Sequence, residues 1–163
     1  MRALGLRSGQ TACDIGGGPG YFSLRLARQV GSQGHVYAIE VEPAILEILR
    51  RRLRAARARN VTPILALADD PLLPRASCDR VLIVNTYHHL PDGPAYLRRL
   101  RCTLKRGGRI ALVDFHKRET PVGPPVPRRV AREELLGDAR RAGLACVAEH
   151  TFLPYQYFVV LSG

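Results

Sequence analysis

Residues 11–23 of the chain read TACDIGGGPGYFS, and this stretch decides the fold. A short apolar run ends in an acid, Asp14, and an amphipathic stretch begins at residue 21. Between them, three glycines stand at alternate positions, Gly16, Gly18 and Gly20. This order predicts a strand, a tight turn and a helix, because glycine permits positive φ and lets the backbone approach a ligand closely. The free N–H groups at the start of the helix would point at the turn. The stretch therefore indicates a site for a nucleotide-like cofactor.

The spacing of the glycines distinguishes between two classes of cofactor. A dinucleotide fingerprint, G-x-G-x-x-G, starting at Gly16 would need glycine where the chain has Tyr21. Here the third glycine comes one residue early, which disfavours a nucleotide-dependent dehydrogenase. The resulting pattern, D-x-G-x-G-x-G, resembles motif I of the class I S-adenosylmethionine (SAM)-dependent methyltransferases. The resemblance implies that the glycine turn and Tyr21 lie at the methionine part of SAM, and that Asp14 helps orient its amino group.

Apolar runs and amphipathic stretches alternate along the rest of the chain. Strands are expected at 11–15, 35–40, 61–66, 79–85, 109–115, 144–150 and 155–161, and helices at 21–30, 44–59, 95–105 and 131–142. Short loops between them predict one α/β domain over residues 1–163, a doubly wound sheet with an irregular Pro-rich loop at 116–129. The resemblance implies a Rossmann-like sheet with strand order 3-2-1-4-5-7-6, in which the last strand (7) is antiparallel.

Ligands of such sheets bind beyond the carboxyl ends of the strands, at the switch point. Glu40 ends the second strand, where its carboxylate can accept both ribose hydroxyls, and Val41 would lie against the adenine. The resemblance implies a further acid after the third strand, to accept the adenine amine. Counting from the strand puts Leu67 in this place, whereas counting back from the following Leu-Pro pair puts Asp69 there, with Asp70 beside it. Asp69 is the preferred interpretation.

The fourth strand runs into the loop NTYHHLP, residues 85–91. This motif resembles that of the ubiquinone/menaquinone-biosynthesis type of the class, methyltransferase type 11. The resemblance implies that Asn85 contacts the methionine end of SAM. The loop would face the reacting methyl group. A histidine there can orient an acceptor or act as a general base, since its reference pKa lies near neutrality. His88 and His89 are the catalytic candidates, with His88 preferred. Further candidates for the pocket wall are Tyr21, His116 and Tyr155.

Charge leaves three interpretations of the function open. The net charge is +11, and only two of the 25 basic residues are lysines. The densest run of arginines, within residues 50–59, falls on one predicted helix without interleaved aromatic residues for base stacking. The first interpretation is methyl transfer from SAM, with S-adenosylhomocysteine as product, to a small or lipid-like metabolite. The second makes RNA the acceptor, and the third is a SAM-binding interaction or regulatory module without catalysis.

Composition sets further expectations about location and partners. No apolar run reaches the ~18 residues of a membrane span, and the N-terminus lacks the apolar core of a signal peptide, so a cytoplasmic protein is expected. None of the four cysteines has zinc-site spacing, so no metal is expected. Only ten residues precede the first strand, where the resembled family carries covering helices. The pocket is therefore expected to be open, or closed by a partner subunit or a second copy, or the chain is a truncated form.

Overall fold

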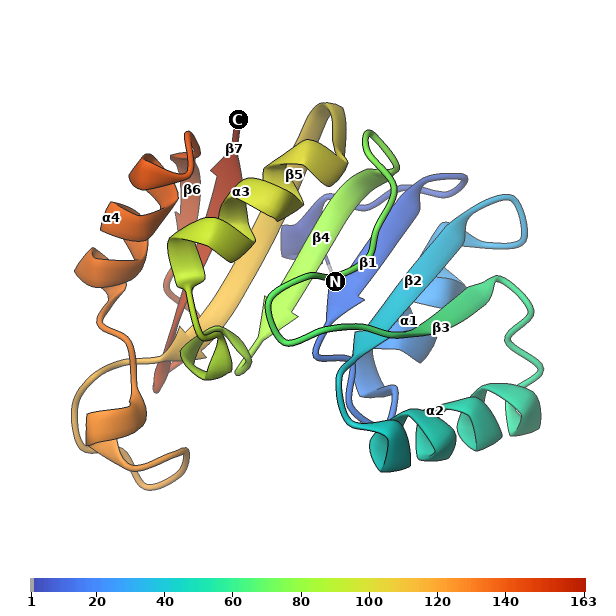
Figure 1. Cartoon of the computed structure of the whole chain (residues 1–163), viewed down its shortest axis with the longest axis horizontal. Helices are drawn as coiled ribbons and strands as arrows, with labels where there is room; N and C mark the ends of the chain where they lie inside the picture. The colour runs from blue at the N-terminus through green and yellow to red at the C-terminus, as the bar shows by residue number, and fades with distance from the viewer. Residues whose placement is uncertain (1) are drawn as a thin grey trace.

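The computed structural model describes residues 2–163 and forms one seven-stranded sheet in the order β3-β2-β1-β4-β5-β7-β6 (Figure 1). Neighbouring strands from β3 to β5 are parallel, whereas β7 is antiparallel to both β5 and β6. The predicted strand order and the reversed last strand are confirmed. The strands are β1 (Thr11–Ile15), β2 (His35–Glu40), β3 (Val61–Leu65), β4 (Cys78–Val84), β5 (Leu104–Phe115), β6 (Ala145–His150) and β7 (Gln156–Ser162).

Local sequence signals mark where the helices begin. α1 follows Gly20, whose φ is +91°, and Pro43 occupies the first turn of α2, where its missing N–H costs nothing. The Asp92 side chain accepts the N–H of Ala95 at 2.9 Å and caps α3. The helices are α1 (Tyr21–Val30), α2 (Pro43–Ala55), α3 (Gly93–Thr103) and α4 (Arg132–Arg141), with short 3-10 turns η1 (Arg2–Leu4), η2 (Tyr87–His89) and η3 (Val126–Arg128).

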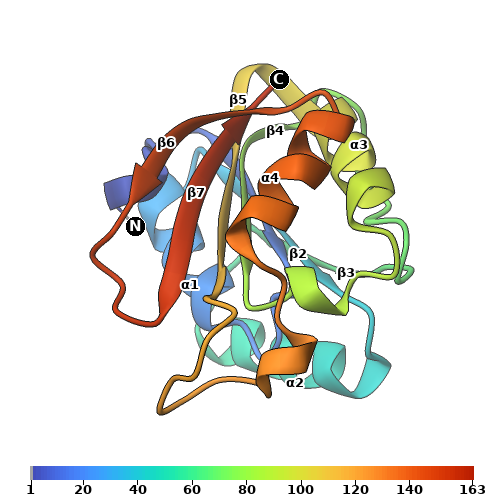
Figure 2. The same cartoon turned by 90° about the vertical axis from the view of Figure 1, so that its left-hand side faces the viewer.

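Helices cover both faces of the sheet, so the central strands, such as β1 and β4, bury side chains on two sides (Figure 2). α1 and α2 pack on one face through residues such as Leu26 and Leu49, and α3 and α4 pack on the other through Leu97 and Leu135. This double burial explains the uninterrupted apolar runs of the parallel strands. On the first face, α1 and α2 contact β1, β2 and β3, whereas the apolar side chains of β4, β5 and β7 border a cavity described below.

The end of α2 and the start of β5 differ most from the sequence expectation. α2 ends at Ala55 rather than at residue 59, because the chain turns at Arg57 in the left-handed region, with φ +52°. α3 ends at Thr103, and β5 already begins at Leu104, five residues earlier than expected, so Gly107 and Gly108 lie within the strand. The last carbonyls of α3 are taken by the loop before β4, since the Ser77 N–H donates to Thr103 at 2.8 Å.

The segment between β5 and α4 contains the Pro-rich loop and packs around one buried arginine. Arg129 is 4% exposed. Its guanidinium donates to five acceptors at 2.7–3.4 Å, the carbonyl oxygens of four loop residues and the Thr120 hydroxyl. The carbonyls belong to His116, Arg118, Val122 and Pro124. The loop therefore has a polar centre that holds an otherwise irregular backbone in one shape.

No helix among the described residues 2–163 combines the length and the apolar character needed to cross a bilayer.

Candidate functional site

The glycine turn between β1 and α1 leaves open space above one of its glycines. A Cβ at Gly16 would lie 2.4 Å from the Thr86 hydroxyl, and one at Gly20 would lie 2.5 Å from Leu49, so close packing requires glycine at both positions. Gly18 also has positive φ, +53°, yet a Cβ there would meet no atom within 4 Å. The turn is thus closely packed at Gly16 and Gly20 and open between them at Gly18, as a ligand-facing loop requires.

Glu40 connects the end of β2 to this turn. Its carboxylate accepts the backbone N–H of Gly18 at 3.1 Å, of Val41 at 2.8 Å and of Glu42 at 3.0 Å. These three hydrogen bonds fix the carboxylate at the carboxyl edge of the sheet, directly beside the open part of the turn. A carboxylate has about four lone-pair sites, so Glu40 keeps capacity for a further donor.

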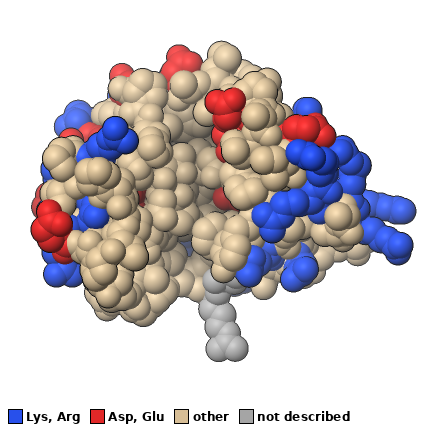
Figure 3. All heavy atoms as spheres, turned by 90° about the horizontal axis from the view of Figure 1, so that it is seen from below, with Lys and Arg blue, Asp and Glu red and all other residues tan. Residues whose placement is uncertain are grey.

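A cavity of about 530 Å³ lies at this edge. Figure 3 views the molecule from the side where the parallel strands end and shows the surface hollowed in its middle. Four predicted site residues line this cavity, Gly16, Glu40, Val41 and His89. The other wall residues come from the ends of β1 and β2, from the segments after β2, β3 and β4, and from α3. They are Ile15, Ile39, Glu42, Ala68, Thr86, Leu90 and Tyr96.

Asp14 lies beneath the turn rather than in the cavity wall. Its carboxylate is 2% exposed and accepts the Ser23 hydroxyl of α1 at 2.6 Å. Burial raises the pKa of Asp14 to about 6, against the lowering effect of the hydrogen bond from Ser23. The structure therefore places this acid where it joins β1 to the first turn of α1.

Three other predicted cofactor residues lie outside the cavity wall. Asp69 and Asp70 are partly exposed and pair with Arg99 of α3 at 3.8 and 3.6 Å, while the preceding Ala68 lines the cavity. The Tyr21 ring is half exposed, and the Arg25 guanidinium lies 3.6 Å from its centroid. The side chains of the two acids are thus engaged by a surface arginine, and that of Tyr21 by its neighbour on α1.

Asn85 follows β4 in an uncommon backbone conformation. Its φ is +52°, a left-handed value that asparagine tolerates better than most residues. Its side-chain oxygen accepts the amide of Gln156, at the start of β7, at 2.6 Å. The pair links the carboxyl end of β4 to the turn between β6 and β7.

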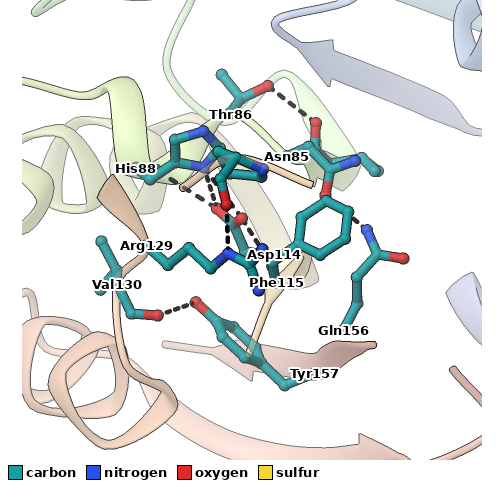
Figure 4. A network of polar contacts seen from close by, with 11 residues as sticks. Asn85, Thr86, His88, Asp114, Phe115, Arg129, Val130, Gln156 and Tyr157 are labelled. Carbon is teal, nitrogen blue, oxygen red and sulfur yellow. Dashed lines mark hydrogen bonds and ion pairs between the residues drawn. The ribbon is translucent and has the colours of Figure 1, made fainter. Parts of the chain in front are cut away.

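The two neighbouring histidines of η2 have different surroundings. His88 is turned inward, with its side chain 4% exposed and its Nδ1 3.0 Å from both carboxylate oxygens of Asp114, at the end of β5 (Figure 4). His89 is exposed and lines the cavity, with its ring 4.1 Å from that of His88. Partial burial and the neighbouring His88 lower the pKa of His89. The histidine that can meet a ligand is therefore His89, and His88 supports it.

Sequence reasoning assigned no role to Asp114, although a signal for it was present. An acid stands at the end of the fifth strand, and the loop with the histidines follows the fourth. Because β4 and β5 are parallel neighbours, with Val84 opposite Val113, these two ends meet. The remaining wall candidates are elsewhere. The His116 ring packs on the Tyr157 ring with a centroid separation of 5.8 Å, and the backbone N–H of His116 donates to the carbonyl oxygen of Tyr155.

A second cavity, of about 470 Å³, lies on the α1 face of the sheet. Its wall is almost wholly apolar, and its polar member is Gln156, the partner of Asn85. The wall is formed by Ala3, Leu4, Phe22, Leu82, Val84, Val113, Phe152, Leu153, Gln156 and Phe158. The Asn85–Gln156 pair thus stands at one border of a hydrophobic chamber. Among the described residues, no group of three or more His, Cys, Asp or Glu side chains is arranged to hold a metal ion.

Comparisons with known proteins agree with this geometry. A family model described as a methyltransferase domain matches residues 12–108. The chain is 37% identical over 109 residues to a protein-L-isoaspartate O-methyltransferase of Methanothrix thermoacetophila, covering 67% of this chain and 49% of that protein. It is 31% identical over 125 residues to a ubiquinone/menaquinone biosynthesis C-methyltransferase of Vibrio vulnificus, covering 76% of this chain and 47% of that protein. The chain thus spans about half the length of the curated relatives it matches.

Among solved structures, a SAM-dependent methyltransferase from Aquifex aeolicus superposes with a TM-score of 0.94 at 25% identity, over 98% of this chain and 85% of that one.

Proposed function

The chain belongs to the methyltransferase domain family, and on this premise we propose that it transfers a methyl group from SAM to a small acceptor with a large apolar surface. One observation carries the proposal. A cavity with a fixed carboxylate lies at the carboxyl edge of the sheet, and an apolar cavity lies on its α1 face. Gln156 in the wall of the apolar cavity pairs with Asn85, which directly precedes Thr86 in the wall of the first cavity.

The residues of the first cavity fit SAM. Its volume lies within the range of small-molecule sites. Glu40 would accept the ribose hydroxyls, Val41, Leu90 and Tyr96 offer apolar surface to the adenine, and the open backbone at Gly18 leaves room for the amino-acid part. SAM supplies a methyl group activated by a sulfonium. Placement by these residues then supplies much of the catalysis, because a well-oriented pair of reactants reacts far faster than a free one.

The apolar cavity favours a hydrophobic acceptor. Phe22, Val84, Phe152 and Phe158 are part of a wall that offers a single polar side chain, Gln156. Burying an apolar acceptor there would release about 25 cal/mol per Å² of surface removed from water. The Vibrio relative is named for ubiquinone and menaquinone biosynthesis, which supports a quinone-like or lipid-like acceptor. RNA is the less favoured acceptor, because this chamber has almost no polar groups for a nucleotide.

His89 would act as the general base that accepts the proton of an oxygen or nitrogen acceptor. Its lowered pKa keeps the imidazole neutral at pH 7, which is the form that accepts a proton. His88 acts as a positioning residue, since Asp114 holds its ring and the His89 ring packs against it. An acceptor methylated at an activated carbon would need less help from His89.

Calorimetric titration with SAM and S-adenosylhomocysteine tests the cofactor site. Glu40→Gln places an amide N–H₂ against the backbone N–H groups that now donate to the carboxylate, and removes the charge from the ribose site. We expect the dissociation constant for SAM to rise about tenfold or more, since each tenfold step is about 1.4 kcal/mol. Glu47→Gln, an exposed acid of α2, is the matched control and should bind like the parent chain. Equal binding by parent and Glu40→Gln would reject the assignment.

A further inference from the structure

Nearly half of the net charge of the molecule lies in one short segment. Residues 43–63 contain six arginines and one acid, which gives +5 of the total of +11. All six arginine side chains are exposed. Figure 3 shows the densest group of basic side chains at one end of the molecule. The six are Arg50, Arg51, Arg52, Arg54, Arg57 and Arg59.

Four of these arginines line a groove between α2 and β3. The groove has a volume of about 460 Å³, and its wall includes Arg50, Arg54, Arg57 and Arg59 beside Pro63 of β3. Glu47 pairs with Arg50 at 3.8 Å and with Arg54 at 3.2 Å. Within residues 2–163, no carboxylate lies within 4.0 Å of Arg57 or Arg59, and the groove therefore carries a clear excess of positive charge.

Arg57 is held in a conformation that its side chain disfavours. The end of α2 forms a Schellman turn, in which the Ala58 N–H donates to Leu53 and the Arg57 N–H donates to Arg54, both at 3.0 Å. Arg57 occupies the left-handed position of this turn, with φ +52°, where glycine is the common residue. An arginine at a glycine position sacrifices stability, and such strain is concentrated at functional sites.

Two other kinds of partner fit this surface poorly. A partner that adds a strand to β3 needs its outward N–H groups. Val36 donates to Asn60 and Ala66 donates to Glu40, so the even-numbered residues of β3 face β2 and Pro63 faces outward, without an N–H to donate. A membrane surface would need the apolar side of α2, but Leu46, Leu49 and Leu53 are buried in the core.

The geometry points to a binding site for the phosphate backbone of a nucleic acid in the arginine groove. Arginine offers planar, paired N–H donors that match phosphate oxygens, and four of them converge here. Residues 43–63 contain no aromatic side chain to stack on a base, so recognition rests on the backbone and is independent of sequence. This inference does not rest on the proposed methyl transfer, because it concerns a surface with no residue in common with the two cavities.

Fluorescence anisotropy with a labelled RNA duplex and a DNA duplex of the same sequence tests the inference between 50 and 200 mM KCl. Four phosphate contacts predict a slope of log K against log[salt] of about −3 to −4. Arg57→Gly should reduce the slope by about one and weaken binding about three- to tenfold. The same substitution should raise the melting temperature by about 2–4 °C, because glycine relieves the strained turn.

The matched control is Arg98→Gln, which removes an exposed arginine of α3 on the opposite face. It should leave affinity and slope unchanged. SAM titration of Arg57→Gly should match the parent chain, which separates this surface from the cofactor site. Three results would overturn the inference: no salt-dependent binding by the parent chain, equal losses in Arg57→Gly and Arg98→Gln, or equally strong binding to anionic phospholipid vesicles that Arg57→Gly does not weaken.

Discussion

At the scale of single residues, the buried carboxyl of Asp14 couples stability to pH. Its folded pKa of about 6 lies above the value of about 3.9 expected in the unfolded chain. Between these pH values the folded state binds more protons than the unfolded state. The contribution of the protonated Asp14 to the free energy of unfolding is therefore fully present below about pH 4 and is lost as the pH rises through about 6. The loss amounts to about 3 kcal/mol.

Asp14→Asn removes this titration and keeps an acceptor for the Ser23 hydroxyl. We expect the stability of the variant, relative to the parent chain, to be higher at pH 7.5 than at pH 4.5. Urea unfolding of both chains across this range measures the difference. If the free energies of unfolding of the two chains differed by the same amount at every pH, the raised pKa of Asp14 would be contradicted.

His89 provides a second prediction at this scale. With an acceptor methylated at oxygen or nitrogen, His89→Gln should lower kcat by about 10²–10⁴, because the proton acceptor is lost. In the parent chain, kcat/KM should decrease as the pH drops below the pKa of His89, which lies below its ordinary value. This acid limb of the pH profile should be absent from the His89→Gln variant. His88→Asn should lower kcat less and keep the limb. A His89→Gln variant with full activity on such acceptors would exclude proton transfer by this residue.

At the residue scale, the sequence could predict the position of a residue where that position is set locally. Gly16 and Glu40 stand at chain positions that a strand-turn-helix pattern already orders, and both line the cavity. The roles of His88 and His89 depend on a contact between two strands that are remote in the sequence. Only the register of β4 against β5 brings Asp114 to His88 and leaves His89 facing the cavity.

At the scale of elements, the Pro-rich loop depends on Arg129. Arg129→Gln would leave several of its five acceptors without a donor, and the loop would open to water to satisfy them. We expect faster tryptic cleavage after Lys117 and Arg118, with a smaller change in global unfolding. Arg128→Gln, its exposed neighbour, is the control and should leave the cleavage rate at the other sites unchanged. Equal protection of the loop in both variants would show that Arg129 is dispensable.

The two misplaced element ends have different physical reasons. Helical periodicity in α2 continues to residue 59, but the helix closes earlier in a left-handed turn whose hydrogen bonds return to its own last residues, Leu53 and Arg54. At α3 the carbonyls that end the helix accept the N–H groups of Ala76 and Ser77, from the loop before β4. The first end is set by a local turn that periodicity does not reveal, and the second by a tertiary contact that is absent from any local pattern.

At the scale of the molecule, the apolar cavity provides a test of the acceptor class. Val84→Phe adds bulk to its wall, and we expect KM for a quinone-like acceptor to rise about tenfold or more while the dissociation constant for SAM is unchanged. Val147→Phe, at an exposed position of β6, is the control. If both variants had the parent KM, the acceptor would have to bind elsewhere.

The sheet order could be predicted because motif, strand count and terminal hairpin all point to one topology. The apolar cavity could not be predicted, because its wall gathers residues from η1, α1, three strands and the turn before β7. These residues are individually ordinary core residues in the sequence. Their common surface exists only after the sheet has formed.

The two cavities share no lining residue, and under the proposed function this separation has a kinetic consequence. Because their walls are separate, we expect that neither cavity has to be filled before the other can be reached. Donor and acceptor are then free to arrive in either order, and a spent donor can leave while the product is still bound. Initial-rate patterns should be those of a random sequential mechanism rather than a compulsory one.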